Sequence, residues 1–162
     1  MQQALKDIKV LDLTRVLAGP YCTQIMADFG ATIIKIEKPG EGDDTRKWGP
    51  PNLKTNDGCD TSESAYYLSA NRGKHSLAID IKTEEGQNLI HKLLEECDVL
   101  VENFKTNSLK KYGLDFESVH ARHPHIIYAS ITGFGQNGPL AHEPGYDFLA
   151  QAMSGLMSIT GE

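Results

Sequence analysis

Short apolar runs alternate with segments of helical length along most of this chain. The first two runs, at 9–13 (KVLDL) and 31–37 (ATIIKIE), carry the β-branched residues that favour strands. Between them, Gly19-Pro20 suits the first turn of a helix and Phe29-Gly30 suits its C-terminal end. The pattern therefore predicts a strand, a helix and a second strand before the first long polar stretch.

The same alternation continues through the middle of the chain. It predicts a strand at 75–80, a helix from its N-cap Thr83 to 97, a strand at 99–102, short helical stretches at 107–111 and 115–123, and a strand at 126–131. Apolar strands joined by helices of crossover length are typical of a parallel, doubly wound α/β sheet. We therefore expect a Rossmann-like α/β fold whose ligands bind beyond the carboxyl ends of the strands.

Two long segments interrupt this rhythm, at 39–62 and 133–145, and both are rich in glycine and proline. Long loops in a compact domain are either functional or disordered, and these follow the second and fifth predicted strands, where ligands collect. The last segment, 145–162, has apolar residues at helical spacing and several small residues that permit close approach. It predicts a buried helix of a catalytic core that needs a packing partner.

Composition narrows the class of protein. With 162 residues, of which 40% are hydrophobic, the chain is long enough for one soluble domain with a core. A net charge of −6 argues against a nucleic-acid or anionic-membrane partner and favours a metabolite. No apolar run reaches membrane-spanning length and the start lacks signal-peptide character, so we expect a cytoplasmic protein, with mitochondria open if a transit peptide was removed.

Several kinds of chemistry are disfavoured by their missing motifs. The three cysteines, Cys22, Cys59 and Cys97, are widely spaced and indicate neither a disulfide framework nor a zinc site. No histidine pairs with an acidic residue at metal-ligand spacing, no serine lies in GxSxG, and the first turn lacks the GxGxxG of nicotinamide-cofactor proteins. Asp147 is the one carboxylate in an apolar segment, but an aspartate that opens a helix is usually a first-turn charge.

Basic residues suggest where an anion would bind. A helix that opens at Pro20 just after Arg15 could receive an anionic group, and the alternative is a tight turn with a solvated Arg15. A second basic group lies at predicted strand or helix ends that one sheet rim would unite, where it would suit phosphates: Lys74, Lys82, Lys105, Lys110 and Lys111. The mixed charges around the second strand, by contrast, predict a solvated loop: Lys35, Lys38, Glu41, Asp43, Asp44, Arg46 and Lys47.

Five strings occur together and in order: VLDLTRVLAGPYCTQIMADFGATIIKIEKPGEGDDTR, NRGKHSLAIDIKTEEG, DVLVENF, ASITGFGQNGP and GYDFLAQAMSGLMSITG. With them the chain resembles the class III (CaiB/BaiF) CoA-transferases over essentially its whole length, and most of all the succinyl-CoA:glutarate (dicarboxylate) type. The resemblance implies that residues 1–162 are the CoA-binding part of a Rossmann-like large domain, without its remainder or the small domain. It also implies an interlocked homodimer, acyl-CoA and a carboxylic acid as substrates, and no permanently bound cofactor or metal.

The resemblance also implies which residues contact CoA. They are Leu17, Ala18, Lys38, Ile79, Asp80, Ile81, Lys82, Asn103, Phe104, Lys105 and Lys111, with Tyr146 and Asp147 as ligand-lining residues. The family often has arginine where Lys38 and Lys111 stand, so a bidentate grip on phosphate would become a point-charge contact here. Some transferases have glutamine in place of Leu17, which implies a difference in how the acyl group is handled.

The chemistry implied by the family is covalent. An aspartate attacks the acyl-CoA thioester and forms a mixed anhydride, then an aspartyl-CoA thioester. The family pattern puts this aspartate beyond Glu162, so we expect no catalytic residue in the chain and no activity of the chain alone. One alternative is an α-methylacyl-CoA racemase, but Tyr146 stands where racemases have histidine, and a phenol is a poor general base near neutral pH. The other is a non-catalytic CoA-binding module.

Overall fold

Five parallel strands form the centre of the protein, seen in a computed structural model that describes residues 3–161. The strands are β1 (Lys9–Asp12), β2 (Thr32–Glu37), β5 (Lys74–Ala78), β6 (Val99–Glu102) and β7 (Ile127–Ser130). Their order in the sheet is β5-β2-β1-β6-β7, and Val10 of β1 lies opposite both Ile33 of β2 and Val99 of β6. The predicted parallel α/β sheet is therefore confirmed.

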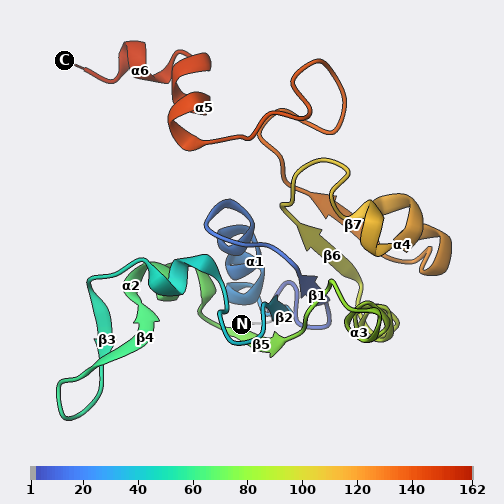
Figure 1. Cartoon of the computed structure of the whole chain (residues 1–162), viewed down its shortest axis with the longest axis horizontal. Helices are drawn as coiled ribbons and strands as arrows, with labels where there is room; N and C mark the ends of the chain where they lie inside the picture. The colour runs from blue at the N-terminus through green and yellow to red at the C-terminus, as the bar shows by residue number, and fades with distance from the viewer. Residues whose placement is uncertain (1–2, 162) are drawn as a thin grey trace.

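Helices cover both faces of this sheet (Figure 1). On one face lie α1 (Ala18–Asp28) and α2 (Ala65–Asn71), and on the other lie α3 (Glu84–Leu94) and α4 (Phe116–Arg122). Leu11 and Leu100 belong to a buried cluster with Ile90 and Leu94 of α3, while neighbouring strand residues such as Val10 pack toward α1. Because successive strand residues point to opposite faces, runs buried on both faces read as almost continuously apolar.

Local signals placed the helix ends well. The Thr83 side chain accepts a hydrogen bond from the Gly86 amide at 3.0 Å and caps α3, as predicted. Gly30 has a φ of +101° just after α1, a conformation that glycine adopts without strain. Helix α3 ends at Leu94, before the predicted residue 97, and the stretch at 107–111 contributes only the single turn η2 (Lys110–Tyr112).

The long loop predicted at 39–62 is partly wrong. It contains a short 3-10 helix, η1 (Asp44–Lys47), and an antiparallel hairpin of β3 (Asn52–Lys54) and β4 (Asp60–Ser64). Helix α2 follows directly and was not predicted either; Ser64 caps it by accepting from the Tyr67 amide at 3.0 Å. Neither strand of the hairpin has the apolar alternation that identifies strands, because the hairpin lies outside the core.

The loop at 133–145 is a closed unit. A Cβ added to Gly133 would lie 2.3 Å from the Cα of Gly145, so only glycines allow the two ends of the loop to touch. The Thr106 hydroxyl donates to the Ala141 carbonyl at 2.7 Å and ties the loop to the segment after β6. The loop thereby sets where the last segment leaves the sheet.

The predicted buried helix at the end of the chain is instead two short exposed helices, α5 (Asp147–Met153) and α6 (Leu156–Ile159). The helical conformation is interrupted between them at Gly155, whose φ is +80°. Both helices stand apart from the sheet (Figure 1), and Phe148 and Ile159 are 76% and 79% exposed. The apolar residues are present as predicted, but no described part of the chain covers them. Within residues 3–161, no helix is long and apolar enough to cross a membrane.

Candidate functional site

The carboxyl ends of all five strands meet at one edge of the sheet. The chain runs from β1 outward to β2 and β5, and then returns to β6 on the other side of β1. In sheets of this kind ligands bind at the point where the strand order reverses, which here lies between β1 and β6. The connections that follow β1, β2, β5 and β6 at this edge carry every predicted CoA contact except Tyr146 and Asp147, which come after β7.

A buried carboxylate fixes the turn that follows β1. Asp12 accepts hydrogen bonds from the Thr14 amide at 2.8 Å, the Thr14 hydroxyl at 2.5 Å and the Thr23 hydroxyl at 2.6 Å. Lys74 pairs with the same carboxylate at 3.1 Å. Gly19 makes the turn possible, since a Cβ there would lie 2.3 Å from the Cβ of Thr14. The backbone between β1 and α1 is therefore held from below by a fully buried polar cluster.

A side chain from the connection after β6 holds the same turn from the opposite side of the switch point. The Asn103 amide nitrogen donates to the Arg15 carbonyl at 2.7 Å, and the Asn103 amide oxygen accepts from the Arg15 N–H at 2.8 Å. Both polar atoms of this predicted CoA contact are thus engaged with backbone. Asn103 joins the two segments that flank the switch point.

The start of α1 is open toward this edge. The helix has no acidic residue in its first turn, and no side chain caps its first amides. Leu17, just before the helix, is 45% exposed. The guanidinium of Arg15 lies 5.3 Å from the centre of the Phe104 ring and 3.4 Å from Asp44, and it is exposed. Free helix amides next to an arginine are suited to an anionic group, while the exposure of Arg15 also fits the alternative of a solvated side chain.

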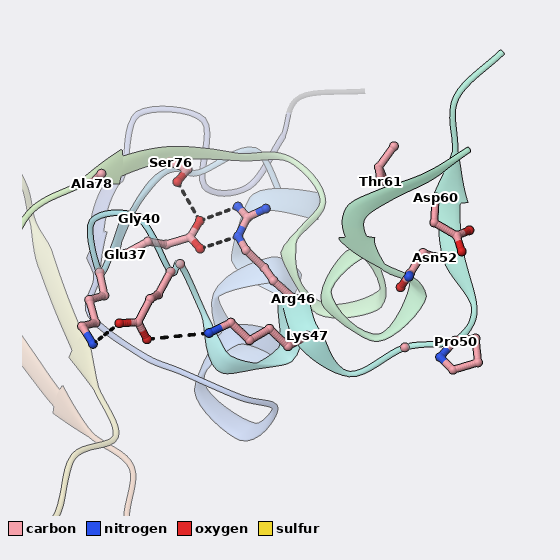
Figure 2. Close-up of a pocket in the computed structure, with 14 residues that line it drawn as sticks. Glu37, Gly40, Arg46, Lys47, Pro50, Asn52, Asp60, Thr61, Ser76 and Ala78 are labelled. Carbon is pink, nitrogen blue, oxygen red and sulfur yellow. Dashed lines mark hydrogen bonds and ion pairs between the residues drawn. The ribbon is translucent and has the colours of Figure 1, made fainter. Parts of the chain in front are cut away.

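A buried ion pair lies at the end of β2 (Figure 2). The Glu37 carboxylate receives Arg46 Nε at 2.7 Å, Arg46 Nη2 at 2.8 Å and the Ser76 hydroxyl at 2.7 Å. The Tyr67 hydroxyl and the Asp43 amide also donate to it. Burial acts to raise the pKa of Glu37, but these hydrogen bonds, led by that from Arg46, outweigh it and lower the pKa to about 2.

This pair bears on two expectations from the sequence. In dinucleotide-binding folds an acidic residue near this point receives the ribose hydroxyls, whereas Glu37 is already saturated by protein donors. The geometry thus adds to the missing glycine motif as an argument against a nicotinamide cofactor. The predicted solvated loop is wrong for Arg46, which is half-buried, and for Lys35 and Asp43, whose side chains are 1% and 0% exposed.

A pocket of about 750 Å³ lies between the loop after β2 and the β3–β4 hairpin (Figure 2). Lys38, a predicted CoA contact, stands at its rim and pairs with Glu41 at 2.5 Å. The pKa of Lys38 is raised by its hydrogen bond to Glu41. The lysine is 56% exposed, so an incoming phosphate can reach it, but only in competition with the Glu41 carboxylate.

The connection from β5 to α3 presents one cation to the edge. The Ile79 and Ile81 side chains are half-buried and pack against the main core, and the Asp80 carboxylate accepts from the Lys82 amide at 3.0 Å. Lys82 itself is exposed. Lys74, which the sequence grouped with it, lies instead under the sheet edge with its amine bonded to Asp12, so the prediction of a rim position for Lys74 is wrong.

The segment after β6 lines a second pocket, of about 410 Å³. Burial raises the pKa of Glu102, which lies in its wall and accepts from the Phe104 amide at 2.7 Å and from the Ser130 hydroxyl. Lys105 is exposed at the mouth of this pocket. Lys111 is exposed on the turn η2, and its amine lies 4.8 Å from the centre of the Tyr112 ring.

Tyr146 and Asp147 are not brought to the sheet edge. They begin α5, on the segment that stands apart from the sheet (Figure 1). Tyr146 is 71% exposed, and the Asp147 carboxylate accepts from the Gln151 side chain one helical turn later at 2.7 Å. Asp147 is thus a first-turn helix residue.

Two of the histidines lie side by side in the interior. His91 of α3 and His123 after α4 lie in contact, with Nδ1 and Nε2 3.1 Å apart, and burial lowers the pKa of both. Over residues 3–161, no group of three or more histidine, cysteine or acidic side chains is placed to hold a metal ion.

Comparison with known proteins identifies the family of this chain. The family model described as CoA-transferase family III matches residues 5–162. The crystal structure of a CaiB/BaiF family protein from Brucella suis superimposes with a TM-score of 0.92 at 49% identity, covering 100% of this chain and 42% of that one. The chain therefore belongs to CoA-transferase family III.

Two relatives are named for a particular reaction. The chain is 54% identical over 158 residues to the succinate–glutarate CoA-transferase of Agrobacterium fabrum, covering 98% of this chain and 39% of that protein. It is 52% identical over 157 residues to the succinyl-CoA:glutarate CoA-transferase of Mus musculus, covering 97% of this chain and 34% of that protein. The chain thus spans little more than a third of the length of these relatives.

Proposed function

We propose that this chain is the CoA-binding part of an acyl-CoA:carboxylate CoA-transferase that moves CoA between a dicarboxylyl-CoA and a carboxylic acid. The observation that carries the proposal is the cationic edge around the switch point. Exposed cations follow four adjacent strands there, and the start of α1 between them has no acidic residue in its first turn. The cations are Arg15, Lys38, Lys82, Lys105 and Lys111.

Each part of this edge suits one part of the CoA molecule. The phosphates carry most of its negative charge, and separated lysines on flexible stems attract it as point charges. The open amides of α1, with Leu17 and Ala18 beside them, would receive an anionic or polarised group close to the thioester. The Phe104 ring, half-buried beneath Arg15, supplies an apolar wall for the less polar part of the molecule.

The proposed reaction needs a nucleophile besides these residues. In the mechanism that the family suggests, an aspartate attacks the acyl-CoA thioester, CoA leaves as the thiolate, and a mixed anhydride forms. The thiolate then attacks the aspartyl carbonyl, the carboxylate departs, and an aspartyl-CoA thioester remains. We assign this aspartate to a position beyond Glu162 because the family pattern puts it there, after the Thr160-Gly161 motif. Asp147 is instead exposed and hydrogen-bonded within its own helix.

The partner in this proposal is a second copy of the protein. Helices α5 and α6 present Phe148, Met153 and Ile159, each more than half exposed. An uncovered apolar surface of this kind is typical of an interface. The proposed assembly is a homodimer in which this segment is covered, as expected for the interlocked subunits of the family.

Two measurements test the function. Calorimetric titration of the chain with CoA and with NADH should show binding of CoA only, and binding of NADH alone would contradict the proposal. Exchange of CoA between succinyl-CoA and labelled glutarate should occur in a protein that contains the proposed aspartate-bearing segment, and it should be lost when that aspartate becomes asparagine. Activity without that segment would show that the nucleophile is misplaced, and binding without any exchange would favour a non-catalytic CoA-binding module. Epimerisation of a 2-methylacyl-CoA would favour the racemase alternative.

A further inference from the structure

One residue in the turn after β1 has an unfavourable backbone. Val16 has a φ of +70°, a left-handed conformation. A β-branched side chain is a genuine outlier there, since its branched Cβ crowds the following carbonyl group. Such conformations persist only where the surroundings impose them, and they concentrate at ligand-binding sites.

The surroundings that hold Val16 come from β2 and the loop after it. The Val16 amide donates to both carboxylate oxygens of Asp43, at 3.3 Å each. The Lys35 amine donates to Asp43 Oδ2 at 2.9 Å and to the Thr14 carbonyl at 2.9 Å. Lys35 and Asp43 therefore form hydrogen bonds with the backbone on both sides of Arg15, at Thr14 and Val16.

The Asp43 carboxylate is itself fixed in place. Its Oδ1 atom also accepts from the Thr45 amide at 3.0 Å and from the Thr45 hydroxyl at 2.8 Å. The side chains of Lys35 and Asp43 are 1% and 0% exposed, so solvent does not compete for these bonds. Burial acts to raise the pKa of Asp43, but the Lys35 charge and the Thr45 hydrogen bonds outweigh it and lower the pKa.

Stability alone does not explain a buried ion pair of this kind. Replacing such a pair by apolar side chains is often neutral or stabilising, so net stability is weak ground for its presence here. Here the bonds of the pair end on the backbone of the first turn, directly before Leu17 and the open start of α1. On the other side, Asn103 holds the Arg15 peptide groups. Three consecutive residues are thus fixed by their backbone atoms.

We propose that Lys35 and Asp43 are positioning residues that hold Val16 in its left-handed conformation, and so aim the start of α1 at the ligand. This inference rests on the proposed CoA-binding function. It adds that the loop after β2 has two tasks. Its exposed Lys38 attracts the phosphates, while its buried Asp43 shapes the neighbouring turn. The turn is then ready for the ligand before the ligand arrives.

The test combines loss of the clamp, which is the set of hydrogen bonds from Lys35 and Asp43 to the backbone of the turn, with relief of the Val16 backbone strain. Asp43→Asn removes the charge from the clamp, and Val16→Gly removes the steric cost of a left-handed conformation. If only about a tenth of the Asp43→Asn molecules keep Val16 in its left-handed conformation, the apparent dissociation constant for CoA rises about tenfold. The double variant should recover most of this loss. Val16→Gly alone should bind nearly as the parent protein does.

A matched control separates this effect from a general change of charge. Asp28→Asn neutralises another aspartate, at the far end of α1, whose carboxylate pairs with Arg72 on the surface. It should leave CoA affinity unchanged. Urea unfolding of each variant gives its folded fraction, so affinities are compared for equal amounts of folded protein. Relief of the left-handed strain by Val16→Gly should stabilise the parent protein and Asp43→Asn alike, but it should raise CoA affinity only in Asp43→Asn. An equal gain of affinity in both backgrounds would contradict a positioning role.

A second readout does not depend on CoA. The backbone chemical shifts of Val16 in a nitrogen-15- and carbon-13-labelled protein report its left-handed conformation directly. They should change in Asp43→Asn and stay at the parent values in the matched control Asp28→Asn. Unchanged shifts in Asp43→Asn would overturn the inference. So would a folded Asp43→Asn protein that binds CoA as tightly as the parent. If the parent protein itself fails to bind CoA, the proposed function is wrong, and the shifts alone decide the positioning role.

Discussion

The Glu37–Arg46 pair makes a quantitative prediction about stability and pH. The Glu37 pKa falls from 4.5 to about 2 on folding, which corresponds to about 3 kcal/mol of stability at neutral pH, at ~1.4 kcal/mol per pKa unit. Because the pKa is lowered in the folded protein, this contribution is fully present above pH 4.5 and is lost as the pH falls through about 2. At about pH 3, roughly 1.4 kcal/mol remains.

The Glu37→Gln variant removes this titration while keeping the shape of the side chain. At pH 7 it should be destabilised by about 3 kcal/mol, because the half-buried Arg46 loses the Glu37 carboxylate and keeps only that of Glu63. At about pH 3 the gap to the parent protein should narrow by about 2 kcal/mol, since the parent has lost most of the same contribution. Urea unfolding followed by circular dichroism at a series of pH values measures both quantities.

The control for this experiment is Glu143→Gln, which neutralises an exposed glutamate in the loop at 133–145. Its stability should stay within about 0.5 kcal/mol of the parent at every pH, as surface substitutions usually do. A gap between Glu37→Gln and the parent that stays constant from pH 7 to about pH 3 would refute the reasoning. It would mean that the Glu37 carboxylate does not ionise more readily in the folded protein.

Three further outcomes follow from the site and from the exposed segment. Glu41→Gln removes the carboxylate that competes for Lys38, so CoA should bind about two- to fivefold more tightly in low salt; calorimetry at two salt concentrations measures this, and weaker binding would place the phosphates elsewhere. Asn103→Ala removes both hydrogen bonds to the Arg15 backbone, so the free energy of unfolding in urea should fall by about 1–3 kcal/mol and CoA should bind more weakly. An unchanged free energy of unfolding would show that the turn holds without Asn103. Phe148→Ser should reduce self-association in analytical ultracentrifugation, and unchanged association would mean that the α5–α6 surface is not the interface.

The sheet could be predicted because its strands carry their own signals. The runs that became β1, β2 and β6 are apolar and short, and Thr83 and Gly30 mark helix ends through purely local geometry. The β3–β4 hairpin and α2 had no such signal, since polar residues dominate the hairpin and α2 begins directly after it. Periodicity detects burial, so the hairpin outside the core is invisible to it, and α2, with seven residues, is too short to show a helical repeat.

The ion pairs under the site show a second limit. The charges from Lys35 to Lys47 look like a solvated loop, but three of them form buried or half-buried ion pairs: Lys35, Asp43 and Arg46. A signal was present, because Lys35 interrupts a strand that is otherwise apolar, and a charge in a fully buried strand must be paired. Its partner could not be named from spacing alone. The family resemblance likewise identifies contact positions, while the engagement of Asn103 with Arg15 required the structure.

The central claim is that CoA binds at the carboxyl edge of the sheet, at the switch point between β1 and β6. Amide hydrogen exchange with and without CoA tests it most directly, because the method maps protection along the whole chain. The account predicts slower exchange in four segments, at 14–20, 38–47, 79–83 and 103–111, and no change in the β3–β4 hairpin tip or in α4. Protection confined to α5 and α6, or no protection at concentrations that saturate binding, would contradict it.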